Sequence, residues 1–207
     1  MTAMAAVEIL ILAAGIITYI WRLQFTFPGF AILLLAFLIA SFVLHRDSFA
    51  SLGFGSRGFV SALRMLVAPT VAIVGVLILI AAVRGSFAGF TLAPHILAGI
   101  GRYFAWSLFQ QFGLQSFFTN RLLSILKKPI WTAWASAVIF ASFHIPNLVL
   151  MPATFFGGFV LAYVFTKTRN VVPLAVAHTL VGILLGLALP AHWHHGLRVG
   201  PGYYRFQ

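Results

Sequence analysis

Apolar residues occur along the chain in seven long runs, separated by short stretches that hold most of the charged residues. A helix that crosses a bilayer core needs about 20 apolar residues, with a range of roughly 17–25. In lipid, backbone hydrogen bonds must close within the protein, which favours helices. The pattern therefore predicts an all-α polytopic transmembrane bundle of about seven spans. The runs cover residues 4–21, 28–44, 65–83, 97–118, 130–145, 148–165 and 171–189.

Prolines mark two places in this pattern. Pro69 lies inside the third run, where it predicts a kink. The fifth and sixth runs are separated only by Pro146 and Asn147, so they form either a tight hairpin or one broken helix. The tail, residues 190–207, is polar and aromatic, and we expect it to form an ordered cap. Without an internal repeat or a linker, residues 1–207 are expected to form one integral membrane domain.

Composition supports the membrane class and excludes several others. Of the 207 residues, 62% are hydrophobic and 7% are charged, whereas soluble domains contain about 25% charged residues. The chain has no cysteine, so thiolate metal sites and cysteine nucleophiles are excluded. Glu8 and Asp47 are its two acidic residues. Mechanisms that need paired carboxylates are therefore nearly excluded.

The net charge of +11 does not indicate nucleic-acid binding, because the 13 Lys and Arg residues are scattered between apolar runs. Cytoplasmic loops of membrane proteins carry an excess of such residues. With seven spans, five basic residues fall on one side and eight on the other, so we expect a cytoplasmic N-terminus, in a bacterial inner membrane. No basic residue precedes the first run, and no cleavable signal is expected. The larger set is Arg46, Arg57, Arg64, Arg121, Lys127, Lys128, Lys167 and Arg169.

Three groups of polar residues lie inside the predicted spans, where polar side chains are costly and mark candidate sites. The fourth run contains Gln110, Gln111 and Gln115, and the last two share a helix face because they are four residues apart. His144 ends the fifth run, and His178 lies within the seventh. Such residues serve either as hydrogen bonds between helices or as a site. We expect Gln111, His144 and His178 to line one cavity.

The second and third groups carry motifs in a fixed order. Residues 140–144 read Phe-Ala-Ser-Phe-His, followed by Ile-Pro-Asn, and His178 is followed four residues later by Gly182. This order resembles the CPBP family, the CAAX-processing and bacteriocin-processing (Abi) intramembrane proteases, whose members carry EExxxR, FxxxH and HxxxN along a helical core. The second motif is complete, whereas glycine replaces the asparagine of the third. The resemblance implies a CPBP-like core over about residues 97–189.

The first motif departs from the family in its chemistry. Gln110 and Gln111 stand where the resemblance places the two glutamates, and Gln115 stands in place of the arginine. In the family the first glutamate is thought to activate water, and the histidines help to bind water or a metal. Glutamine cannot accept a proton near neutral pH, as a general base must. An arginine without an acidic partner would be an unpaired buried charge. The replacement of all three charged residues of the motif by glutamine is therefore consistent, because it leaves no unpaired charge.

The resemblance assigns family roles to seven positions. We expect a pseudoenzyme without glutamate-type protease activity, which binds a peptide, a prenylated or other lipid, or a partner protein helix in the former active-site cavity. The positions equivalent to catalytic residues are Gln110, Gln111, His144 and His178. Those equivalent to substrate-binding residues are Gln115, Phe140 and Asn147.

Two other functions are compatible with the histidines. In the first, His144 and His178 bind zinc in an active intramembrane hydrolase, a CAAX-like metallopeptidase, and Gln111 positions water. Zinc catalytic sites have three protein ligands, and the third would come from the tail, which reads Ala-His-Trp-His-His from residue 191. In the second, the two histidines ligate haem. A retinal protein is disfavoured because the lysines all lie near the ends of the runs.

Overall fold

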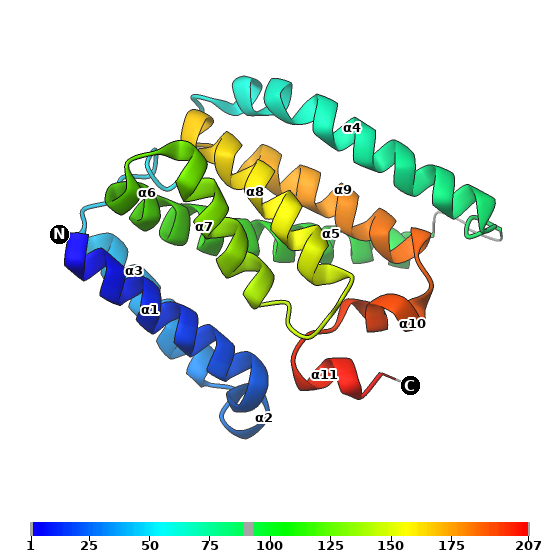
Figure 1. Ribbon diagram of the computed structural model, residues 1–207, viewed down its shortest axis with the longest axis horizontal. Coiled ribbons are helices and arrows are strands. Elements are labelled where there is room, and N and C mark those ends of the chain that lie inside the picture. Colours follow the sequence, from blue (N-terminus) through cyan, green and yellow to red (C-terminus); the bar gives the residue numbers. More distant parts are fainter. Residues whose placement is uncertain (1, 89–92, 207) are drawn as a thin grey trace.

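The computed structural model describes residues 2–88 and 93–206. Within these residues the chain is helical, apart from loops and one isolated β-bridge between Phe54 and Asn170. The long helices lie side by side in a bundle (Figure 1). This confirms the all-α fold predicted from the sequence.

The helices follow the predicted apolar runs. Their bounds are α1 (Thr2–Thr18), η1 (Tyr19–Leu23), α2 (Gln24–Thr26), α3 (Phe30–Leu44), α4 (Phe59–Val83), α5 (Pro94–Gln111), η2 (Phe112–Thr119), α6 (Asn120–Leu126), α7 (Pro129–Ser142), α8 (Leu150–Thr168), α9 (Val172–Ala188), α10 (Ala191–His194), η3 (His195–Leu197) and α11 (Pro201–Tyr204).

At three places the helices differ from the predicted apolar runs or decide between alternatives that the sequence left open. Helix α4 begins at Phe59, before the apolar run does, and continues as one helix past Pro69. The fourth run continues beyond its apolar residues, through η2 and α6 to Leu126. The fifth and sixth runs form two separate helices, α7 and α8, that pack against each other as a hairpin. A single broken helix is thereby excluded.

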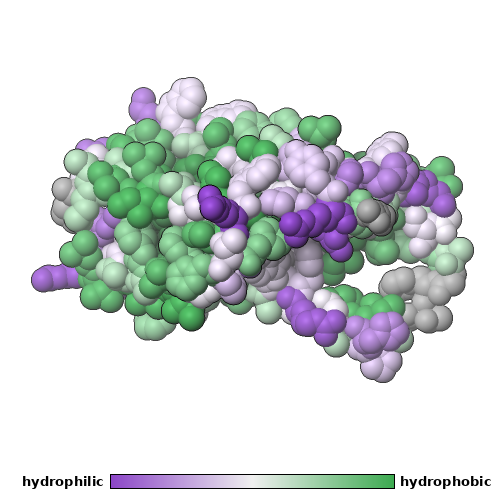
Figure 2. All heavy atoms as spheres, turned by 90° about the horizontal axis from the view of Figure 1, so that it is seen from below, coloured by the Kyte–Doolittle hydropathy of each residue, from purple (hydrophilic) through white to green (hydrophobic). Residues whose placement is uncertain are grey.

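The bundle has a surface suited to lipid. Three helical stretches, Thr2–Thr26, Phe59–Val83 and Leu150–Thr168, are long and apolar enough to cross a membrane. Shorter apolar helices accompany them at Phe30–Leu44, Pro129–Ser142 and Val172–Ala188. Large apolar side chains face outward along α1, α3 and α4, and apolar residues cover much of the face with the α1–α3 hairpin (Figure 2). The seven predicted spans are compatible with this arrangement.

The middle of the bundle consists of α5, η2, α7, α8 and α9, with the α1–α3 hairpin on one flank and α4 on the other (Figure 1). Phenylalanines fill the boundary with the hairpin, where Phe42 of α3 lies against Phe117 of η2 at a centroid separation of 6.4 Å. On the opposite flank, Leu66 of α4 packs in one cluster with Phe165 of α8 and Leu174 of α9. These two apolar layers enclose the polar residues of the middle helices.

The two ends of the bundle differ in charge. The α3–α4 loop, α6, the start of α7 and the α8–α9 turn gather at one end (Figure 1, left). These segments, together with the first turns of α4, the α6–α7 turn and the last turn of α8, carry the eight basic residues that the sequence assigns to one side of the membrane. Hydrogen bonds join them, since Asn120 donates to the carbonyl of Ser51 and Asn170 to that of Gly55, each at 2.8 Å. The tail with α10 and α11 lies toward the other end.

Candidate functional site

The junction of α5 and η2 brings two glutamines together with a histidine of α9. Gln115 Nε2 donates to Gln111 Oε1 at 2.9 Å, and Gln111 Nε2 lies 3.1 Å from His178 Nδ1. Both glutamine side chains are fully buried. The shared helix face predicted for Gln111 and Gln115 is therefore confirmed, and the face points at His178.

The same hydrogen bonds continue to a third helix. Thr119 Oγ1 donates to Gln115 Oε1 at 2.8 Å and lies 2.9 Å from Ser136 Oγ of α7. A hydroxyl has one proton, and Thr119 gives it to Gln115, so Ser136 donates to Thr119. We call this series the amide chain; it joins α7 to α9 through Ser136, Thr119, Gln115, Gln111 and His178.

The direction of the amide chain fixes the tautomer of its histidine. Gln111 Oε1 accepts from Gln115, so its Nε2 is the atom that donates to His178 Nδ1. A nitrogen that accepts a hydrogen bond carries no proton, and the neutral imidazole of His178 is therefore protonated at Nε2. The remaining members are amides and hydroxyls. None of those four groups can accept a proton near neutral pH.

His144 lies close to this chain without belonging to it. Its Nδ1 is 2.7 Å from the carbonyl oxygen of Phe140, which only accepts, so Nδ1 carries the proton and Nε2 keeps a free lone pair. The Phe140 ring centroid lies 4.8 Å from that of His144 and 5.9 Å from that of His178. The two imidazoles are therefore separated by less than the sum of these distances.

The backbone around the glutamines has an unusual winding. From Phe112 to Thr119 it forms a π-helix, and six of these eight residues are buried. π-Helical turns are rare and occur frequently at functional sites. Here the π-helical turn contains two members of the amide chain, Gln115 and Thr119. The sequence analysis did not predict it, because no residue type marks a π-helix.

The two other predicted positions lie outside the amide chain. Gln110 is partly exposed, and its side chain forms no hydrogen bond with any residue in the described part of the chain. Asn147 is fully buried; its Oδ1 accepts from the backbone N–H groups of Val149 and Leu150 at the start of α8. Its Nδ2 donates to the carbonyls of His194 and Arg198 at 2.7 and 3.0 Å. Asn147 thus ties the tail to the α7–α8 hairpin.

A tyrosine that the sequence analysis missed completes the surroundings of His178. The Tyr103 ring on α5 meets the His178 ring edge-on, with centroids 6.5 Å apart. A Cβ atom placed on Gly182 of α9 would collide with the Tyr103 hydroxyl. In the third CPBP motif this position is asparagine, so the tyrosine fills space next to the family's asparagine position. No spacing rule connects residues 103 and 182, which explains why the sequence did not reveal the pair.

The two carboxylates form a separate buried cluster around Arg121 of α6. Glu8 Oε2 lies 3.3 Å from Arg121 Nε and 3.0 Å from His45 Nε2. Asp47 Oδ2 lies 2.7 Å from Arg121 Nη2, and Ser41 Oγ donates to Glu8 at 3.0 Å. We call these five residues the ionic cluster. The sequence analysis did not predict this cluster, although Glu8, as the single acidic residue of an apolar span, could have indicated a nearby buried cation.

The residues present do not fit a zinc site. Among the described residues, no group of three or more His, Asp or Glu side chains is arranged to hold a metal ion. Of the two core histidines, only His144 offers a free ring nitrogen, its Nε2, because His178 accepts from Gln111 at Nδ1 and carries its proton on Nε2. In the tail, His194 Nδ1 accepts from the N–H of Leu197, and His195 Nδ1 lies 3.1 Å from the Tyr203 carbonyl. The expected third ligand from the tail is not brought to the other two.

This arrangement of motifs coincides with a family match. Residues 92–184 match the family model described as Type II CAAX prenyl endopeptidase Rce1-like. The chain contains an Rce1-like domain. Its matched range includes the whole amide chain together with Phe140 and His144, and it confirms the CPBP resemblance seen in the motifs. No curated protein and no solved structure matches the chain.

Proposed function

We propose that this protein is a non-hydrolysing member of the Rce1-like family, which binds a membrane-associated peptide with a prenylated end and does not cleave it. The observation that carries the proposal is the amide chain itself. Where the family resemblance places a glutamate, Gln111 donates a hydrogen bond to His178 and accepts one from Gln115. Its side chain is committed to holding the neighbouring helices.

The chemistry of hydrolysis lacks a carboxylate base here. General-base assistance contributes about 10²–10⁴-fold in rate, and an amide does not supply it. Glu8 and Asp47 are both bound to Arg121, so neither replaces the missing glutamate. His178 is held at Nδ1 by Gln111, and the free Nε2 of His144 is assigned here to binding.

Binding of a peptide does not require a general base, and His144 is suited to binding. Its Nε2 lone pair accepts a hydrogen bond from a peptide N–H, and its ring stands against Phe140. An apolar chain such as a prenyl group is accommodated by the apolar helix surfaces around the site. The family description names CAAX prenyl endopeptidases, which is why a prenylated peptide is proposed ahead of another lipid or a partner helix.

The same proposal gives the protein an orientation in a bacterial inner membrane. The end that gathers the eight basic residues would face the cytoplasm, because cytoplasmic loops carry the excess of Lys and Arg. The N-terminus lies at that end (Figure 1). Labelling of single cysteines introduced at residues 46 and 169 tests this, since reagents confined to the periplasm should leave both unmodified.

The decisive experiment mixes the purified full chain in detergent with a fluorescent farnesylated peptide and measures binding and cleavage. We expect binding without cleavage, and weaker binding by His144→Ala than by the control His192→Ala. The pair Gln110→Glu with Gln111→Glu should introduce slow cleavage, whereas Gln24→Glu should not. Cleavage by the native chain that His144→Ala abolishes would show instead an active endopeptidase. Absence of peptide binding would refute the proposed ligand.

A further inference from the structure

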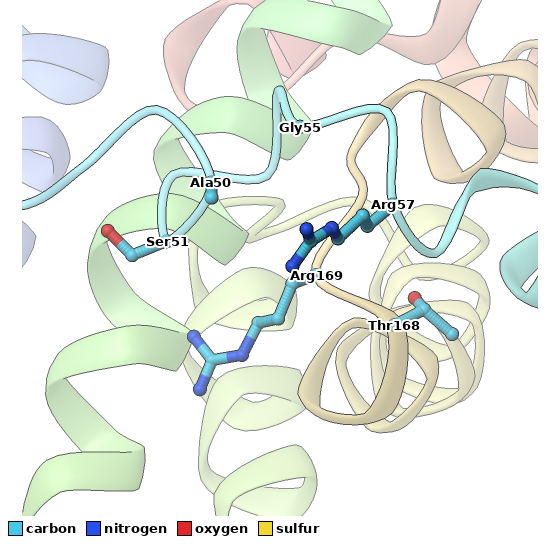
Figure 3. Close-up of a pocket in the computed structure, with 6 residues that line it drawn as sticks. All are labelled: Ala50, Ser51, Gly55, Arg57, Thr168 and Arg169. Atoms are coloured by element: carbon cyan, nitrogen blue, oxygen red, sulfur yellow. The ribbon is translucent and has the colours of Figure 1, made fainter.

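A hollow of about 470 Å³ lies at the basic end of the bundle, between the α3–α4 loop and the α8–α9 turn (Figure 3). Small-molecule sites have volumes of about 300–1,000 Å³. Its lining contains two arginines and no carboxylate-bearing residue. The lining residues are Ala50, Ser51, Gly55, Arg57, Thr168 and Arg169.

The two arginines are held near each other by the backbone. Gly58 has a positive φ of 82°, and a Cβ atom there would collide with the carbonyl of Thr168, so the loop closes directly on the end of α8. Arg169 donates to Asn120 and lies over the Phe165 ring at 5.5 Å. In Figure 3 the Arg57 side chain extends across the hollow to the start of the Arg169 side chain, and the Arg169 side chain continues away from it, downward in this view.

The positive charge of this pair is not balanced by the described part of the chain. Neither Arg57 nor Arg169 forms an ion pair there, and Asp47, the nearest carboxylate to Arg169, is bound to Arg121. Burial lowers the pKa of Arg169, and the charge of Asp47 offsets that shift only in part. An anion in the hollow would offset the cost of burying the Arg169 charge.

The surroundings indicate what kind of anion fits. Apolar aromatic side chains stand outward beside the hollow: Phe49 is 80% exposed, and Phe54 and Phe59 are also exposed. Exposed apolar rings beside cationic groups are suited to the membrane interface, where the acyl chains of lipids meet their charged headgroups. Guanidinium groups bind phosphate oxygens through paired, charge-assisted hydrogen bonds.

We propose that the hollow bounded by Arg57 and Arg169 binds the phosphate of an anionic phospholipid, with the acyl chains passing over the exposed phenylalanines of the loop. The site is separate from the amide chain, and it does not depend on whether the protein binds or cleaves a peptide. It would anchor the α3–α4 loop to the lipid layer on which the basic end lies.

The test uses the full chain in detergent and native mass spectrometry to measure dissociation constants for phosphatidylglycerol and phosphatidylcholine. Phosphatidylglycerol should bind more tightly, and Arg57→Gln should weaken its binding about tenfold, the ratio expected for one charge-assisted hydrogen bond. The matched control is Arg64→Gln, which removes the same charge from the same end and is not part of the lining. Salt screens the charge of an exposed arginine outside the hollow, so Arg64→Gln should weaken phosphatidylglycerol binding about twofold or less.

Further arms of the experiment separate the alternatives. Arg169→Lys keeps the charge and removes the paired donors, so it should also weaken binding of phosphatidylglycerol. Equal losses in Arg57→Gln and Arg64→Gln would show general attraction and overturn the proposal. Equal affinity for the two lipids would overturn it as well. Glycerol phosphate that competes as strongly as the intact lipid would show a site for a soluble phosphate compound instead.

Discussion

The hydroxyl of Tyr103 lies against Gly182, in the space that a Cβ atom at residue 182 would occupy. The ring carbons Cζ and Cε1 are also too close for such an atom, at 2.8 and 2.9 Å. Helices α5 and α9 therefore approach each other at this point only because residue 182 is glycine. An asparagine at residue 182 would therefore require the Tyr103 side chain to move.

Gly182→Ala should destabilise the protein by about 1–3 kcal/mol, the range for overpacking a tight contact. In a Tyr103→Ala background the same substitution should be neutral or stabilising, since alanine favours a helix over glycine by about 1 kcal/mol. Gly157→Ala, at a helical position with no atom near the new Cβ, is the control. The measurement is the free energy of unfolding in mixed micelles, and an equal loss in both backgrounds would contradict the contact.

Gln111→Leu should destabilise the protein by about 1–3 kcal/mol, because it leaves buried polar groups of Gln115 and His178 without partners. Gln110→Leu changes the same residue type one position away and should have little effect, since Gln110 is partly exposed. Denaturant unfolding of the two variants in micelles provides the comparison. If they unfold alike, the amide chain does not hold the helices together.

Arg121→Met should cost about 3–5 kcal/mol, the usual penalty for leaving a buried charge without its partner. Two carboxylates lose that partner at once, Glu8 and Asp47. Adding Glu8→Gln and Asp47→Asn should recover most of the loss, because the cluster is then neutral. Thermal unfolding of the single and triple variants checks this. A triple variant as unstable as the single one would show that Arg121 acts by packing alone.

Asn147→Asp should release the tail. The carboxylate still accepts hydrogen bonds at the start of α8, but it no longer donates to the carbonyls of His194 and Arg198. Trypsin should then cut after Arg198 and Arg205 several times faster than in the native protein. Asn170→Asp is a matched control, because Asn170 also caps a helix and donates to a loop, at the opposite end of the bundle. Equal tail cleavage in both variants would refute the role of Asn147.

Much of the fold follows from the sequence because lipid imposes a simple rule on helix length and composition. The apolar runs gave the long helices to within a few residues at most ends, as for 171–189 and Val172–Ala188. The start of α4 was missed, since its first two turns, which include Arg64, lie at the end of the bundle and need not be apolar. The continuation of the fourth run to Leu126 was missed for the same reason.

The candidate site was predictable only where one helix brings its residues together. The spacing of Gln111 and Gln115 predicts their shared face, and a hydrogen bond of 2.9 Å joins them. The roles of Ser136 and Tyr103 depend on how three helices pack, and their residue types occur in many apolar helices. The ionic cluster joins residues from 8 to 121, and the sequence shows only that Glu8 needs a partner.

The ionic cluster has a consequence for how the protein is made. Glu8 belongs to α1, whereas Arg121 of α6 is synthesised over a hundred residues later. At a synthesis rate of about 5–20 residues per second, Arg121 is made on the order of ten seconds after Glu8. During that interval Ser41 of α3 and His45, which directly follows α3, are its available partners. The α1–α3 hairpin therefore supplies partners for Glu8 from its own residues before α6 joins it.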